Sequence, residues 1–124
     1  MPYEGTDQRL SNYIRVHRRK SGLSQGDLGF VLGYRDEETI ARHERFRVIP
    51  PLEIAVSYEI VFRVPVSEMF WGLRDELELK IEASLVQLEN QLGQRSARDR
   101  DALTTARKLM WLRARKASES EFVA

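Results

Sequence analysis

The chain has 124 residues, enough for one compact domain with an appendage, and its 42% apolar and 31% charged content is that of an ordinary soluble globular protein. It contains no cysteine, which excludes disulfides, thiolate catalysis and zinc–thiolate sites. No apolar run approaches the roughly 20 residues that span a bilayer, and the first residues lack the apolar core of a signal peptide. We therefore expect a cytoplasmic protein without a membrane segment.

The net charge of +1 hides an uneven distribution along the chain. Residues 10–21 and 93–117 are rich in arginine and lysine, whereas residues 73–92 are rich in acids. Local basic surfaces matter more for phosphate contact than the global sum. A near-neutral total is still a weak indication of nucleic-acid binding, so charge alone does not decide the function.

Capping residues and apolar spacing predict several short helices in the first half of the chain. The first helix is expected to begin at an N-cap of Ser11 and to end before Gly22. Ser24 then caps a second helix, with Asp27 at the third position as in a capping box, and Gly33 ends it.

The third helix is expected after an N-cap of Asp36, with Glu37 and Glu38 in the first turn, where the helix dipole favours acids. Pro51 suits the first position of a fourth helix. A short fifth helix is predicted near Met69.

Only one stretch resembles a strand. Residues 60–66 are β-branched but contain Pro65, which favours a helix end followed by a turn. The expected fold class is therefore all-α, with a five-helix domain over residues 1–72, a helical extension over 73–117 and a frayed tail over 118–124.

The extension carries an amphipathic pattern. Apolar residues at steps of three and four predict a long helix with a narrow seam, formed by Leu77, Ile81, Leu85, Leu88 and Leu92. A break over Gly93–Ser96 follows, and then a basic helix.

An ordered set of residues between Leu10 and Gly72 carries the main functional signal. Its parts are Gly22-Leu23-Ser24-Gln25-Gly26-Asp27-Leu28, Leu32-Gly33-Tyr34 and Thr39-Ile40-Ala41-Arg42-His43-Glu44, followed by Pro50, Pro65 and Phe70. In this order and spacing they resemble the Cro/repressor-type (XRE-like) helix-turn-helix family. The resemblance implies a repressor-type domain and a sequence-specific transcription regulator that binds double-stranded DNA, with a recognition helix of about Glu37–Arg45 in the major groove.

The residue types suit that geometry. A glycine-containing turn lets the third helix project from its scaffold. Leu28, Leu32 and Ile40 are expected to lock the two helices together. The first turns of the third helix then stay free to contact base edges.

The resemblance also assigns individual contacts. Gln25 would contact a phosphate or a flanking base, and Arg42 suits a bidentate contact to guanine. Glu37 or Glu38 suits acceptance from cytosine, and its alternative role is charge complementarity at a helix N-terminus. The expected DNA-binding residues are Ser24, Gln25, Arg35, Glu37, Glu38, Thr39, Arg42 and Arg45.

Members of this family commonly pair an arginine of the first helix with the glutamate that ends the recognition helix. Those positions are Arg18 and Glu44 here, so we expect a structural role for Arg18. The chain departs from the pattern at Gly26 and Gly29, where better helix formers are usual, although a small residue at 29 allows close helix packing. Arg45-Phe46 replaces the usual glycine after the recognition helix and leaves the path of the next loop open.

The seam of the extension has two interpretations. It folds back on the domain, or it builds a two-fold homodimer, which palindromic operators favour. We favour the homodimer because one small domain offers little surface for two further helices.

Other functions are weighed against DNA binding. One alternative is an antitoxin-like or other protein-interaction module whose C-terminal helices, basic over residues 95–116, bind a partner. Another is a helix-turn-helix that keeps its fold but has lost DNA binding, which the acidic reading positions favour. An enzyme is not expected, and neither is a metal or cofactor, because His17 and His43 lack partners at metal-ligand spacing and no nucleotide-binding or metalloprotease motif occurs.

Overall fold

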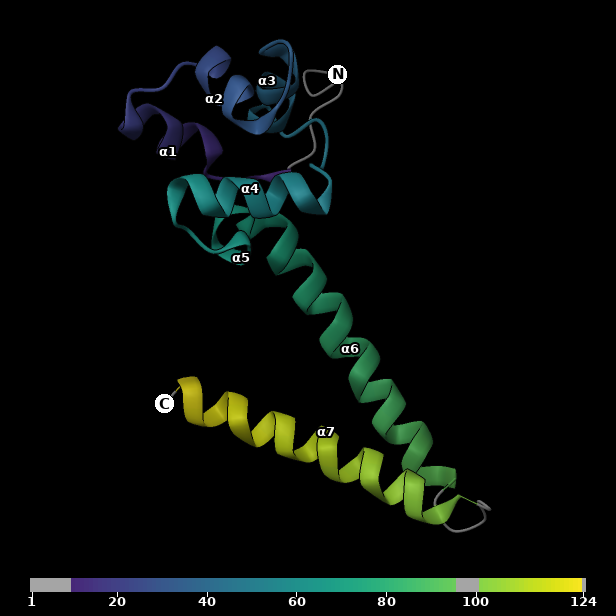
Figure 1. Cartoon of the computed structure of the whole chain (residues 1–124). Coiled ribbons are helices and arrows are strands. Elements are labelled where there is room, and N and C mark those ends of the chain that lie inside the picture. The colour runs from purple at the N-terminus through teal and green to yellow at the C-terminus, as the bar shows by residue number, and fades with distance from the viewer. Residues whose placement is uncertain (1–9, 96–100, 124) are drawn as a thin grey trace, which may run out of the picture. The chain divides into compact units, whose positions relative to one another are not determined.

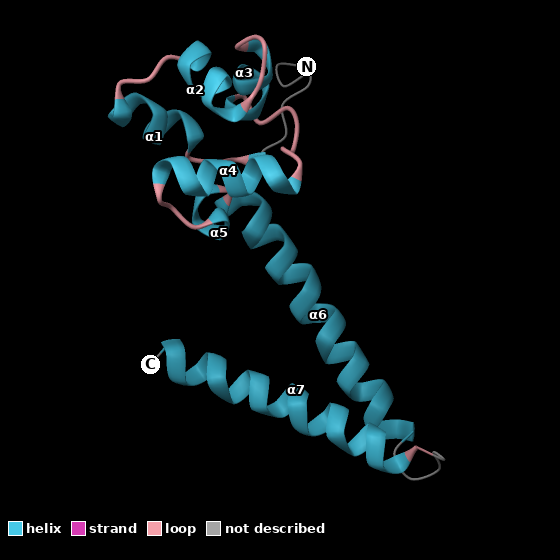
Figure 2. Cartoon of the chain, viewed as in Figure 1, coloured by secondary structure: helices cyan, strands magenta, loops and turns pink. Residues whose placement is uncertain are grey.

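A computed structural model describes residues 10–95 and 101–123, with side chains through Ser118. These residues form helices joined by loops, without a strand (Figures 1 and 2). The predicted all-α class is therefore confirmed. Among the helices described, none is both long and apolar enough to cross a membrane.

The chain divides into two packed units, Met1–Leu77 and Glu78–Ala124, and the division falls inside a long helix. The helices of the first unit are α1 (Ile14–Ser21), α2 (Gln25–Leu32), α3 (Glu38–Glu44), α4 (Leu52–Phe62) and α5 (Val66–Met69). The first turns of α6 (Trp71–Arg95) follow. One apolar core joins these helices, formed by the buried residues Ile14, Leu28, Ile40, Ala55, Tyr58, Met69 and Phe70.

The start of α1 differs from the prediction. Tyr13 holds the cap position, and Ser11 is buried, with its carbonyl accepting a hydrogen bond from the backbone N–H of Gly72 (3.1 Å). The Asn12 carboxamide oxygen instead accepts from the N–H of Ile14 (3.1 Å), where α1 begins. The helix thus begins two residues later than an N-cap of Ser11 predicts. The predicted end is present, since Gly22 adopts the left-handed conformation (φ 80°).

The second helix follows its local signals. The Ser24 hydroxyl accepts from the N–H of Asp27, and the Asp27 carboxylate accepts from the N–H of Ser24, both at 3.0 Å. The hydrogen bond that the Ser24 backbone N–H donates to the carboxylate is the main cause that lowers the pKa of Asp27. Gly33 closes the helix with φ 88°. The predicted capping box and glycine end are therefore confirmed.

The boundaries of α3 and α4 are each displaced by one residue. The Asp36 carboxylate accepts from the N–H of Glu38 (3.0 Å), but Glu37 holds the cap position and Glu38 begins α3. Pro51 is the cap of α4 rather than its first residue. Beyond α3, Phe46 adopts φ 61°, and the N–H of Arg47 bonds to the carbonyl of Arg42 (3.1 Å). Phe46 thus takes the left-handed position that glycine usually fills.

The two unusual glycines of α2 lie in different surroundings, and we expect opposite effects from alanine. At Gly26 a Cβ would lie 3.6 Å from Ser24 Oγ, an ordinary contact, so Gly26→Ala should raise the free energy of unfolding by about 0.5–1 kcal/mol through helix propensity. At Gly29 a Cβ would lie 3.1 Å from the backbone oxygen of Asp36. Gly29→Ala should therefore lower the free energy of unfolding by about 1 kcal/mol, because the steric crowding outweighs the gain in helix propensity. Urea denaturation of both variants measures these changes. Stabilisation by Gly29→Ala would show that the turn after α2 shifts to accommodate the methyl group without a cost in stability.

The second unit is a helical hairpin made by the remainder of α6 and by α7 (Ala102–Val123). Leu85 and Leu92 of α6 pack with Leu109 and Leu112 of α7. The Arg115 guanidinium donates two hydrogen bonds to the Glu82 carboxylate. The seam thus folds back on the basic helix that follows it in the chain.

The hairpin corrects two boundaries of the extension. The predicted break does not begin at Gly93, because α6 continues to Arg95; residues 96–100 lie outside the described part. The frayed tail predicted over 118–124 is instead helical to Val123, and Ala124 lies outside the described residues. After Gly93 the chain contains no glycine or proline, the residues that end helices most strongly.

Candidate nucleic-acid interface

The third helix has one buried and one exposed face. Ile40, Ala41, His43 and Glu44 are buried against the rest of the first unit. Glu38, Arg42 and Arg45 are exposed on the opposite face, where spacings of four and three residues place them in one row. The inner face therefore fixes the orientation of a row of long polar side chains.

An ion pair joins two members of this row. Arg42 Nε lies 3.6 Å from Glu38 Oε1, and both side chains are 57% exposed. Such exposed pairs contribute little stability, about 0.3–0.5 kcal/mol in a helix. Arg42 can therefore leave Glu38 for a stronger bidentate acceptor at small cost.

Two more exposed arginines flank the row, because Arg35 precedes α3 and Arg47 follows it. Neither of them, nor Arg45 of the row, has an ion-pair partner in the described part of the chain. Arg47 was not among the predicted residues, although the run Arg42, Arg45 and Arg47 in the sequence is the signal that could have found it.

The predicted contacts of α2 point partly inward. The Gln25 amide donates from Nε2 to Glu44 Oε1 (3.2 Å), so this half-buried side chain ties the start of α2 to the end of α3. Ser24 is exposed, and its hydroxyl caps α2. Thr39 is half-buried. A DNA contact by any of the three remains a prediction.

Glu37 lies beside the start of α2. A Cβ on Gly26 would be 3.8 Å from the Glu37 carboxylate. The partial positive charge of a helix N-terminus favours an acid there. Glu37 thus lies close to the start of α2 as well as at the start of α3, whereas Glu38 lies on the outer row in its ion pair with Arg42.

The expected pair of Arg18 and Glu44 is present. Arg18 Nε donates to Glu44 Oε2 (2.6 Å) and Nη2 donates to Oε1 (3.1 Å), and the side chains are 13% and 3% exposed. Arg18 Nη1 also donates to the carbonyl of Leu23 (3.0 Å). The hydrogen bond to Glu44 raises the pKa of Arg18. Arg18 therefore fastens α1 to the end of α3, as its structural role requires.

A buried aromatic cluster supports the inner face of α3. His43 Nδ1 and the Tyr58 hydroxyl share a hydrogen bond of 2.8 Å. The His43 ring packs edge-on against Tyr34 and Tyr58, and Tyr58 packs against Phe70. Burial lowers the pKa of His43 to about 4, against an opposing effect of Glu44, and burial also raises the pKa of Tyr58. Both groups are therefore neutral near pH 7. The Asn12 amide also donates to the His43 carbonyl (2.8 Å). Neither His43 nor Asn12 was predicted as a support of α3.

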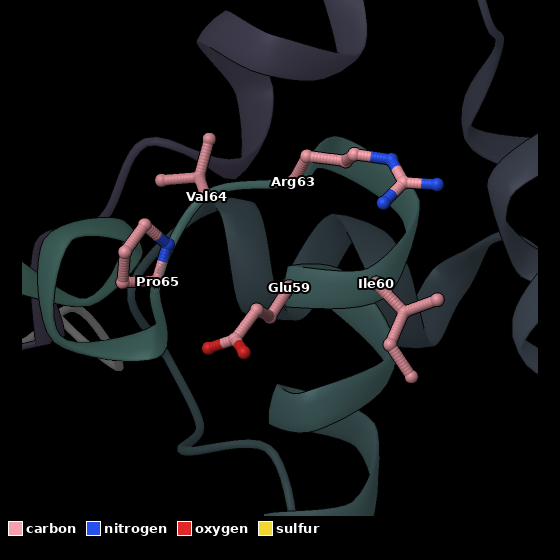
Figure 3. Close-up of a pocket in the computed structure, with 5 residues that line it drawn as sticks. All are labelled: Glu59, Ile60, Arg63, Val64 and Pro65. Carbon is pink, nitrogen blue, oxygen red and sulfur yellow. The ribbon is translucent and has the colours of Figure 1, made fainter.

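A depression on the first unit contains an acid with a structural role. A depression of about 330 Å³ is lined by Glu59, Ile60, Arg63, Val64 and Pro65 (Figure 3). The Glu59 carboxylate accepts from the N–H of Val66 (2.8 Å), so the acid of this pocket holds the start of α5. In the described parts of both units, histidine, aspartate and glutamate do not form a group of three or more that could hold a metal ion.

Comparison of the chain with protein-family models, curated proteins and solved structures finds no match. The geometry of α2, α3 and their surrounding arginines is therefore the feature from which a function is inferred.

Proposed function

We propose that the chain is a sequence-specific DNA-binding transcription regulator of the helix-turn-helix type, with α3 as its recognition helix. The observation that carries this proposal is the combination of a locked inner face on α3 with a solvent-facing row of Glu38, Arg42 and Arg45. A groove-reading helix needs both features, since long side chains select bases only when the backbone is held rigidly.

The surrounding charges support contact with the DNA backbone. Arg35, Arg45 and Arg47 are exposed and unpaired within the described residues. Arginine and lysine contacts to phosphates position a protein on the duplex. The acids Glu37 and Glu38 oppose this attraction, so sequence-independent affinity should be low and discrimination should depend on base contacts.

Arg42→Ala tests the proposal with the full-length chain and a duplex that the chain enriches from a random pool. We expect binding to the enriched duplex to weaken by about 1–3 kcal/mol, so that its Kd rises about 5- to 150-fold. The Kd for random duplex should change little. Arg42→Lys is the matched control, because lysine keeps the charge but loses the planar fork. It should lose nearly as much affinity as alanine.

Other outcomes would overturn parts of the proposal. Equal losses on enriched and random duplexes, with full rescue by lysine, would make Arg42 a phosphate contact. Failure of the unmodified chain to enrich any duplex would contradict DNA binding itself and favour a helix-turn-helix that has lost it.

Glu38→Gln addresses the second reading position. The change removes a base-reading acceptor charge and an exposed ion pair, so it should alter the base preferred at one position of the enriched duplex while leaving stability almost unchanged. Sequencing of duplexes enriched by the variant measures this preference. An unchanged motif would exclude Glu38 from base reading.

A further inference from the structure

The hairpin of α6 and α7 leaves much of its apolar surface uncovered. Its core is small and consists of Leu92, Leu109 and Leu112, with Leu85 packed against them. Other large apolar side chains of the two helices are at least 40% exposed: Leu79, Ile81, Val86, Leu88, Leu103, Met110 and Trp111. Apolar surface that a fold leaves open to this extent generally marks a site of interaction.

Part of this surface is a groove lined by residues of both helices. The groove has a volume of about 460 Å³, and its lining consists of Leu88, Thr104, Arg107, Lys108, Trp111 and Leu112. Trp111 is 61% exposed, whereas Leu112 is buried and belongs to the hairpin core. An apolar side chain that enters the groove would therefore pack directly against that core.

Two bases at the groove have no counterpart within the hairpin. Elsewhere on α7, Arg113, Arg115 and Lys116 form ion pairs with glutamates of α6. Arg107 and Lys108 are exposed at the groove and have no ion-pair partner among the described residues. The groove thus places two positive charges beside an apolar lining.

The acids that would complement these charges must come from outside the hairpin. Each acid of α6 already has an interaction within the chain: Asp75, Glu76, Glu78, Glu82 and Glu89. The α6 helix of a second copy therefore has no free acid to offer, and an acidic segment of another protein is the better match.

The lining favours a protein over a nucleic acid. Proteins that bind single strands stack successive bases on several aromatic side chains. This groove has one aromatic residue, Trp111, and the apolar remainder of its lining is the aliphatic pair Leu88 and Leu112. Three further bases of α7 that a phosphate backbone would need are already paired with α6. Apolar side chains and scattered carboxylates fit this surface better than a continuous row of phosphates.

We propose that the groove beside Trp111 binds an acidic amphipathic helix of another protein. The apolar face of that helix packs on Leu88, Trp111 and Leu112, and carboxylates at the edge of that face pair with Arg107 and Lys108. In contacts of this kind the anchoring side chains recur at spacings of three and four residues. This contact is separate from the proposed DNA contact of α3 and does not depend on it.

Selection from a displayed library of random 20-residue peptides against the full-length chain tests the proposal. The enriched peptides should combine apolar residues at helical spacing with aspartate or glutamate. Trp111→Ala should raise the Kd of an enriched peptide by about 30-fold or more, the effect of losing a central aromatic anchor. Met110→Ala is the matched control, since Met110 is 69% exposed beside Trp111 but does not line the groove. It should change Kd by less than about 3-fold.

A charge exchange tests the expected pairing. The double variant Arg107→Glu, Lys108→Glu should bind the enriched peptide about 10-fold or more weakly, because like charges then meet across the contact. The same peptide with its acids replaced by lysine should bind this double variant and not the unmodified chain. Added salt should weaken the original pair.

Circular dichroism should show equal helix content in all these variants, because each replaced side chain is exposed. Enriched peptides without an excess of acids, or peptides that bind Trp111→Ala as tightly as the unmodified chain, would overturn the proposal. A dimer that depends on Trp111 and excludes the peptides would overturn it in favour of a second copy of the chain. Binding of single-stranded oligothymidylate that depends on Trp111 and displaces the peptides would overturn it in favour of a nucleic acid.

Discussion

Removing either partner of the Arg18–Glu44 pair should lower the free energy of unfolding by about 3 kcal/mol, because the remaining charge stays largely buried without its partner. The two side chains are only 13% and 3% exposed. Glu44→Ala would leave both the Arg18 guanidinium and the Gln25 amide without their acceptor. Arg18→Ala would leave a buried carboxylate with Gln25 alone.

A double-mutant cycle in urea measures the interaction. The variant that lacks both charges should lose clearly less than the sum of the single losses, with a coupling energy of about 1–3 kcal/mol. Arg19→Ala is the matched control, since Arg19 is exposed on the same helix, and it should stay within about 0.5 kcal/mol of the unmodified chain.

The cycle also separates two roles of Arg18. Absence of coupling, together with a loss of DNA affinity but not of stability in Arg18→Ala, would reassign Arg18 to phosphate contact. The observed geometry predicts that Arg18→Ala lowers stability directly. Any loss of DNA affinity should follow only from the displacement of α3.

Short-range signals in the sequence predicted the features that short-range physics controls. The hydrogen bonds of the Ser24–Asp27 capping box join residues three positions apart, and Gly22 and Gly33 are required by their own positive φ angles. Such features need no knowledge of the rest of the fold. The predicted N-cap at Ser11 was wrong: Tyr13 holds that position, and Ser11 is buried beside a residue more than sixty positions away along the chain, since its carbonyl accepts from the N–H of Gly72.

The apolar periodicity predicted α6, but it could not show which residues of the seam pack against another helix and which stay exposed. Leu85 and Leu92 pack on α7, whereas Ile81 and Leu88 stay partly exposed, although all four belong to one repeating pattern. Which of them meets α7 depends on the rotation of the second helix, and spacing within the first helix carries no information about that rotation. The groove beside Trp111 has the same origin and was therefore not predictable from the sequence.

In the candidate interface, too, some features could be predicted from the sequence and others could not. The pair of Arg18 and Glu44 was reached through a resemblance, and the exposed row of Glu38, Arg42 and Arg45 follows from helical spacing. The partner of His43 could not be read from the sequence, because Tyr58 lies in a different helix and a single helical histidine has many common roles.

His43 should make the stability of the first unit depend on pH between about 7 and 5. Burial lowers the pKa of His43 to about 4 in the folded chain, whereas an unfolded histidine has a pKa near 6.5. Above that value neither state binds the proton, and the full stability is present. As pH falls below about 6.5, the unfolded state binds a proton that the folded state rejects, so the free energy of unfolding falls. The loss from this group should reach about 2 kcal/mol at about pH 5.

The His43→Gln variant tests this linkage, because glutamine stays neutral while it retains hydrogen-bonding groups that can reach the Tyr58 hydroxyl. Its baseline stability will differ from that of the unmodified chain, so the comparison concerns the slope against pH. The variant should lose most of the slope between about pH 7 and pH 5. Because the chain has a second histidine, His17, the same measurement on His17→Gln is needed to assign the slope to position 43. An unchanged slope in His43→Gln would show that the buried ring accepts its proton without disrupting α3. The expected loss of slope would instead mean that the folded chain keeps His43 neutral beside the Tyr58 hydroxyl.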